Sequence, residues 1–208
     1  MRIFAPDGKL AGTLNRIGDL IILNLLTIIC CIPIITIGAS MTALYSVTLK
    51  MAKNEEGKVV SGFFNAFREN FKQATILWLI GGGTMVLLAA DIYVCRYIGG
   101  TPGMIMKGSL LALLVFVAMI VMYLFPVLAR FENTTKNTAK NAALFSMSHF
   151  FKSLLMLAAN LIPIAVLAIS MRFVIVDVLV GLSGIAFLTS LYYRHVFGLI
   201  EEKQILNN

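Results

Sequence analysis

The sequence predicts an all-α fold, a polytopic membrane helix bundle of about five transmembrane helices with two interfacial amphipathic helices in its cytoplasmic loops. Hydrophobic residues make up 59% of the 208 residues and charged residues only 13%, and the mean hydropathy is +0.90, unlike a water-soluble domain. Apolar runs long enough to cross a bilayer recur along the chain, and Lys and Arg lie mostly between them. We therefore expect one integral membrane domain over residues 1–208.

The first predicted span, residues 20–49, contains no charged residue. At about 1.5 Å per residue it is too long for one straight crossing. Pro33 lies in its middle and Gly38 follows closely, so we expect a helix break between them, because proline removes a backbone donor and clashes with the preceding turn. The run is then either one kinked span or a re-entrant hairpin, and the sequence leaves both open.

Four further spans are predicted at residues 74–94, 108–129, 153–171 and 173–193. Glycines and Pro102 mark a tight connection between the first two of these. Two longer segments carry apolar residues at helical spacing, which predicts a helix in the membrane interface within each. These residues are Val60, Phe63, Phe64, Phe67 and Phe71 in one segment, and Leu144, Met147 and Phe151 in the other.

The distribution of Lys and Arg predicts the orientation, because short loops rich in these residues are retained in the cytoplasm. The loops at residues 50–73 and 130–152 carry most of them, so both loops and the C-terminus are expected to be cytoplasmic. The amino-terminal segment, with Arg2, Lys9 and Arg16, also favours the inside. A single first span forbids that placement and a re-entrant run allows it, so the side of the N-terminus stays open.

The segment around the expected break combines a proline with small residues and hydroxyl groups: Pro33, Thr36, Gly38, Ser40 and Thr42. Broken membrane helices expose backbone groups that can bind polar ligands or ions. Alternatively, the small residues permit close helix packing and the hydroxyls bond the freed backbone. Packing is the favoured interpretation, and a binding site is the alternative.

Other polar residues give weaker signals. Asp91 is the carboxylate placed well within an apolar run, and its position near the outer end of the span favours an interfacial anchor over a proton or cation site. Asn24 and Asn160 are expected to form interhelical hydrogen bonds. The spacing of Cys and His matches no metal or catalytic motif, so we expect no metal, no cofactor and no enzymatic activity. The net charge of +7 comes from Lys and Arg between the apolar runs, which indicates membrane topology, so we expect no nucleic-acid partner.

Several motifs resemble the YesL family of bacterial integral membrane proteins. They comprise Asn15-Arg16-x-x-Asp19, the stretch from Pro33 to Tyr45, Phe63-Phe64-x-x-Phe67-x-x-Asn70-Phe71-x-Gln73-Ala74, and Phe125-Pro126-x-Leu128-Ala129-Arg130-Phe131-Glu132-Asn133 with Lys140-Asn141-Ala142. The resemblance implies a bacterial cell membrane and an association with carbohydrate ABC importers and their sensor kinases. The candidate partner contacts are Phe63, Phe67, Asn70, Phe71, Pro126 and Arg130.

Two functions are therefore expected from the sequence. The favoured one is a non-catalytic accessory or regulatory membrane protein that acts with a carbohydrate ABC importer or a sensor kinase. The chain is not expected to be the permease itself, because the loop from Lys53 to Gly57 does not match the permease motif that docks the ATPase. The alternative is a small transporter with its site at the helix break between Pro33 and Ser40. The sequence leaves the substrate, the partner and the oligomeric state open.

Overall fold

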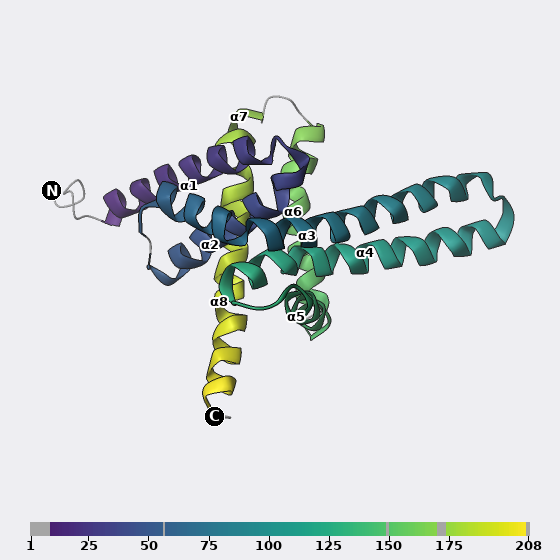
Figure 1. Cartoon of the computed structure of the whole chain (residues 1–208). Helices are drawn as coiled ribbons and strands as arrows, with labels where there is room; N and C mark the ends of the chain where they lie inside the picture. The colour runs from purple at the N-terminus through teal and green to yellow at the C-terminus, as the bar shows by residue number, and fades with distance from the viewer. Residues whose placement is uncertain (1–8, 56, 149, 170–173, 207–208) are drawn as a thin grey trace.

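The computed structural model describes residues 9–55, 57–148, 150–169 and 174–206, and every element in these ranges is helical, which confirms the all-α prediction. The elements lie along the chain as shown in Figure 1. They are α1 (Lys9–Cys31), the 3₁₀ turn η1 (Ile34–Thr36), α2 (Ile37–Lys53), α3 (Val59–Val94), the 3₁₀ turn η2 (Cys95–Tyr97), α4 (Gly100–Arg130), α5 (Thr135–Ser148), α6 (Phe150–Ile169), α7 (Val174–Val176), the π-helical turn η4 (Asp177–Gly181) and α8 (Leu182–Leu206).

Among the described residues, five helical segments are long and apolar enough to cross a membrane, or six if the bent pair of α5 and α6 counts as one span, which fits a multi-pass membrane protein. These segments cover different residues from the predicted spans. The first predicted span supplies two segments, Leu14–Cys31 and Ile34–Lys53, because the chain breaks between them. The span predicted at 153–171 corresponds to α6, which passes only together with α5, and the chain bends by 105° between these two helices. The predicted limits at residues 171 and 173 lie outside the described residues.

The break in the first run is present, and it turns the chain back on itself. α1 ends at Cys31, and α2 starts at Ile37 after one 3₁₀ turn. α1 and α2 pack against each other, and Arg16 near the start of α1 donates a hydrogen bond to the Asn54 side chain just past the end of α2. The two ends of the run therefore lie together, as in the hairpin interpretation, and not at opposite ends of one kinked rod.

α2 is the centre of the molecule, and it packs against α1, α3, α4 and α8. Twelve of its 17 residues are buried. Its buried hydroxyls are satisfied within the helix, since Thr42 and Thr48 each donate to the carbonyl four residues earlier. Thr48 also shares a 2.8 Å hydrogen bond with Ser190 of α8. A buried helix with hydroxyls can therefore lie among apolar neighbours without unpaired polar groups.

Where α2, α4 and α8 meet, three tyrosines are the largest fully buried side chains among the described residues. Tyr193 of α8 makes edge-on ring contacts with Tyr45 of α2 at 5.9 Å and with Tyr123 of α4 at 5.3 Å. All three side chains are almost fully buried. The Tyr123 hydroxyl shares a 3.0 Å hydrogen bond with Ser153 of α6, so this cluster joins four helices.

α3 and α4 form a long antiparallel pair whose far ends extend beyond the other helices, while α6 and α8 run across this pair (Figure 1). α3 has 36 residues, which gives a length of about 54 Å. It is continuous through residues 60–73, so the first predicted interfacial helix is instead the first half of α3. The extension carries exposed apolar side chains such as Val86, Leu87 and Met104, a surface suited to lipid.

Candidate functional site

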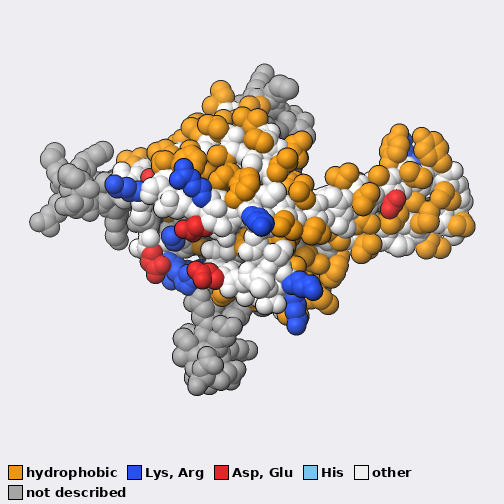
Figure 2. All heavy atoms as spheres, viewed as in Figure 1, with side chains coloured by type: hydrophobic (Ala, Val, Ile, Leu, Met, Phe, Trp, Pro, Cys, Tyr) orange, Lys and Arg blue, Asp and Glu red, His pale blue; other side chains and the backbone are white. Residues whose placement is uncertain are grey.

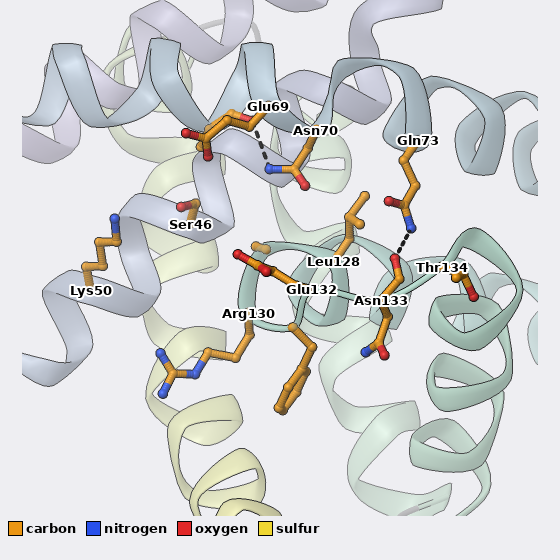
Figure 3. A pocket seen from close by; sticks show the side chains of 13 residues that line it. Ser46, Lys50, Glu69, Asn70, Gln73, Leu128, Arg130, Glu132, Asn133 and Thr134 are labelled. Atoms are coloured by element: carbon orange, nitrogen blue, oxygen red, sulfur yellow. Dashed lines mark hydrogen bonds between the residues drawn. The ribbon is translucent and has the colours of Figure 1, made fainter.

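Charged side chains gather on one side of the molecule, around the end of α2, the start of α3 and the α4–α5 connection, while apolar side chains cover much of the rest of this face (Figure 2). On the charged side a cleft of about 750 Å³ opens between α2, α3 and the α4–α5 connection (Figure 3). We call it the polar cleft, because most of its lining side chains are polar: Ser46, Lys50, Glu69, Asn70, Gln73, Arg130, Glu132, Asn133 and Thr134.

One wall of the polar cleft is a turn of α3. Glu69, Asn70 and Gln73 share this face because residues three and four apart are neighbours on a helix. The Asn70 amide donates to the Ala66 carbonyl at 3.0 Å, and both Asn70 and Gln73 point toward the α4–α5 connection in Figure 3. The Gln73 amide donates to the Asn133 carbonyl at 2.8 Å and to the Thr138 hydroxyl at 3.2 Å. Gln73 therefore holds the opposite wall in place.

The opposite wall is the irregular segment between α4 and α5. α4 ends at Arg130, and Phe131 adopts an extended conformation with φ −118° and ψ 129°, so residues 131–134 turn the chain toward α5. The Thr134 carbonyl accepts the Thr138 backbone N–H at 2.9 Å and starts α5. Glu132 is exposed on this segment and Arg130 is half-buried. The end of α4 thus brings one guanidinium to the cleft and the segment after it brings one carboxylate.

The polar cleft combines charged side chains of both signs with hydrogen-bonding groups. Two carboxylates, Glu69 and Glu132, and two cations, Lys50 and Arg130, surround amides and hydroxyls. Such a set can form ion pairs and hydrogen bonds with a polar ligand or peptide segment. The volume falls within the range of about 300–1,000 Å³ typical of ligand sites.

The six predicted partner contacts are not all at the surface. Asn70 and Arg130 line the polar cleft, and Phe71 is 40% exposed beside it. Phe63 is fully buried and Pro126 is buried within α4, so neither side chain is available to a partner. Phe67 is half-buried and its ring lies between those of Phe63 and Phe71, at 6.2 and 5.5 Å. The row of phenylalanines leads from the core to the surface instead of forming an outward patch.

At the helix break, the predicted hydroxyls are bonded to the backbone. Thr36 donates to the carbonyls of Cys30 and Pro33 at 2.6 and 2.7 Å, and Ser40 donates to the Thr36 carbonyl at 3.0 Å. The Trp78 indole donates to the Ile34 carbonyl at 2.9 Å. These bonds satisfy several carbonyls that the break frees, which supports the packing interpretation over a binding site.

Gly38 is the point of closest helix contact at the break. A Cβ at this position would lie 2.4 Å from the Ala74 carbonyl oxygen and 2.6 Å from the Trp78 Cβ. No side chain fits in this space without a shift of the α3 backbone. Thr42 donates its hydroxyl to the Gly38 carbonyl at 2.9 Å within α2, so its hydroxyl is satisfied inside the helix while Gly38 allows α2 to pack closely on α3.

The other predicted polar residues lie apart from the polar cleft. Asp91 is exposed near the end of α3, where Arg96 lies over the Tyr93 ring at 5.3 Å. Tyrosine and arginine at the end of an apolar helix are typical of a membrane interface. Asn160 donates to the Met156 carbonyl of its own helix at 2.8 Å and contacts the Met122 sulfur of α4 at 3.5 Å.

Two features were missed by sequence reasoning. In the sequence, Gln73 and Glu132 stand out only as members of motifs, although the spacing of Glu69, Asn70 and Gln73 on one helical face is a signal of a polar wall. The π-helical turn at Asp177–Gly181 was not expected at all. Asn24 is bonded to this turn, since its amide donates to the carbonyls of Asp177 and Val178 at 3.1 and 2.6 Å. No local pattern in the sequence reveals a contact between residues so far apart along the chain.

The comparisons with known proteins add a family of unknown function. A family model described as "Protein of unknown function, DUF624" matches residues 20–92. No curated protein and no solved structure matches the chain. The YesL resemblance therefore stays a prediction. The matched segment runs from α1 to near the end of α3, so the chain is similar to this family over the helix break, the buried α2 and the α3 wall of the polar cleft.

Proposed function

We propose that this chain is a non-catalytic accessory or regulatory protein of the bacterial cell membrane, and that its polar cleft docks a cytoplasmic segment of a carbohydrate ABC importer subunit or a sensor kinase. The observation that carries the proposal is the meeting of two Lys- and Arg-rich segments, residues 50–73 and 130–152, at one cleft. The YesL resemblance supplies the kind of partner. The mixed charges of the cleft suit a polar peptide segment better than an apolar solute.

The proposed orientation places the polar cleft in the cytoplasm. The positive-inside rule assigns the segments 50–73 and 130–152 to that side, and the Arg194 guanidinium at the end of the last apolar segment donates to the Ala52 carbonyl at 2.7 Å. The C-terminal part of α8 therefore leaves the bundle beside the end of α2. Because Arg16 contacts Asn54 there as well, the start of α1 shares this side under the proposal.

Site-specific photo-crosslinking in the native host tests the docking proposal. A photoreactive amino acid at Thr134, which is exposed at the cleft, is expected to give an adduct with an importer subunit or a sensor kinase, identified by mass spectrometry. The matched control is Leu87, 69% exposed on the α3–α4 extension, where adducts with lipid are expected. The same protein adducts from both positions, or none from Thr134, would contradict the proposal.

Charge neutralisation gives a second measure of the same contact. Glu132→Gln removes one carboxylate of the polar cleft and is expected to lower the yield of the co-purified importer subunit or kinase. Asp91→Asn removes one exposed carboxylate far along α3 and should leave that yield unchanged. An equal yield from both variants would show that the polar cleft is not the docking surface.

A further inference from the structure

The π-helical turn Asp177–Gly181 is held from one side by α1. Asn24 is fully buried, and its amide nitrogen donates to the carbonyls of Asp177 and Val178. Its oxygen accepts the Ser183 backbone N–H at 2.8 Å, and the Ser183 hydroxyl donates to the Leu20 carbonyl at 2.8 Å. A π-helical turn disrupts the regular backbone ladder and is frequent at functional sites. Here α1 supplies the hydrogen bonds on the interior side of the turn.

The carboxylate of Asp177 lies on another face of the turn, over Gly181. A Cβ at Gly181 would lie 2.1 Å from Asp177 Oδ1, so the carboxylate occupies the space that a side chain at that position would need. Asp177 lines a groove of about 440 Å³ between α6 and the α7–α8 segment, which we call the Asp177 groove. Its other lining residues include Pro163, Gly184, Ile185 and Leu188, and Asp177 is the one ionisable residue among those described there.

The Asp177 groove opens toward the outer surface of the helices. Three of its lining side chains are more than half exposed: Ile162 at 53%, Val176 at 62% and Leu188 at 64%. Val176 and Leu188 lie within Val174–Arg194, a segment long and apolar enough to cross a membrane, and Ile162 lies beside it on α6. In a bilayer such a surface faces lipid, where a carboxylate is costly and pairing with a positive charge stabilises it. The groove therefore favours an occupant that brings a positive charge from the membrane phase.

The contacts around Asp177 argue against an inorganic cation. A bare metal ion needs several oxygen ligands, but the carbonyl oxygens of Asp177 and Val178 and the Asn24 side-chain oxygen are already engaged in hydrogen bonds. Among the residues that the structure describes, no group of three or more His, Cys, Asp or Glu could hold a metal ion. An organic cation with a large apolar body needs no such ligands, because it fills the groove and pairs with one carboxylate.

We propose that the Asp177 groove binds a lipophilic organic monocation, a molecule with one positive charge on a large apolar body, which enters from the lipid phase and pairs with the Asp177 carboxylate. The charge complementarity and the apolar lining carry this proposal. It is independent of the polar cleft and of the docking partner.

Equilibrium binding of radiolabelled tetraphenylphosphonium to the full-length protein in phosphatidylcholine nanodiscs tests the proposal, with empty nanodiscs as the blank. The wild-type protein is expected to bind saturably. Asp177→Asn is expected to weaken binding about tenfold or more, the change that loss of one charge pair of about 1.4 kcal/mol produces. Asp91→Asn, which neutralises an exposed carboxylate on α3, should bind as the wild type does.

A second variant keeps the test valid if Asp177→Asn does not fold. Leu188→Trp retains the carboxylate and fills part of the groove from an exposed position, so it should weaken tetraphenylphosphonium binding without a change of charge. Binding by the wild type that is no greater than the blank, or equal binding by wild type and both groove variants, would overturn the proposal.

Discussion

At the scale of single residues, Gly38 is the position where α2 and α3 are closest, and the added methyl group of Gly38→Ala would collide with backbone and with Trp78. The atoms that it would meet are the Ala74 carbonyl and the Trp78 Cβ, which cannot swing aside as the end of a flexible side chain can. We expect Gly38→Ala to lower the free energy of unfolding by about 1–3 kcal/mol, the usual cost of overpacking. Thermal unfolding in detergent measures it.

Gly83 provides the matched control for Gly38. It lies inside α3, and a Cβ at this position would meet no side chain or neighbouring helix within 4 Å. Gly83→Ala therefore adds the same methyl group without a collision. Because alanine favours helix by about 1 kcal/mol over glycine, this variant should unfold at the wild-type temperature or slightly above it. Equal destabilisation of the two variants would show that close packing at Gly38 is not what limits substitution there.

Asn24 is the second residue whose role can be isolated. Replacing it with alanine removes two donated hydrogen bonds and one accepted hydrogen bond at the π-helical turn. Leaving buried polar groups unpaired costs about 1–3 kcal/mol, so Asn24→Ala should lower the unfolding temperature clearly. Asn160→Ala is the comparison, since Asn160 bonds mainly to its own helix, and its loss should cost less. A larger effect at Asn160 would contradict this ranking.

At the scale of elements, the sequence predicts the helix break well, because Pro33 ends α1 through a local steric effect. It predicts the length of α3 poorly. Polar residues such as Arg68 and Glu69 suggest a separate interfacial helix, but no proline interrupts residues 59–94 and the helix runs through. The polar cleft lies beyond local reasoning altogether, since Gln73 acquires its role from Asn133, sixty residues later.

The link between α3 and α5 is itself testable. Gln73→Ala removes the hydrogen bonds from α3 to Asn133 in the α4–α5 connection and to Thr138 in α5, so the start of α5 should open more often. Hydrogen–deuterium exchange of the backbone N–H groups in residues 134–138 is expected to rise in this variant. Lys72→Ala, the exposed neighbouring position, is the control. Unchanged exchange in Gln73→Ala would mean that other contacts hold α5.

At the scale of the whole molecule, the α1–α2 hairpin decides how often the chain can cross the membrane. Its turn docks on the middle of α3, through the Ile34 carbonyl and Trp78, and its two ends meet at Arg16 and Asn54. The start of α1 therefore lies beside the end of α2 and the segment that follows it. Under the proposed orientation this geometry keeps Arg16 on the cytoplasmic side with the segments 50–73 and 130–152, as the positive-inside rule favours, whereas a single first span would separate them.

Cysteine accessibility tests that arrangement across the whole chain. In a variant with Cys30, Cys31 and Cys95 replaced by alanine, single cysteines are placed at Leu14, Glu55, Lys136 and Thr101, the last of which lies at the start of α4. A membrane-impermeant maleimide added to intact cells should label position 101 alone. Positions 14, 55 and 136 should react only after permeabilisation, because all three then face the cytoplasm. Labelling of position 14 from outside, with 55 protected, would show that the first run crosses the membrane once and that the hairpin does not form in the bilayer.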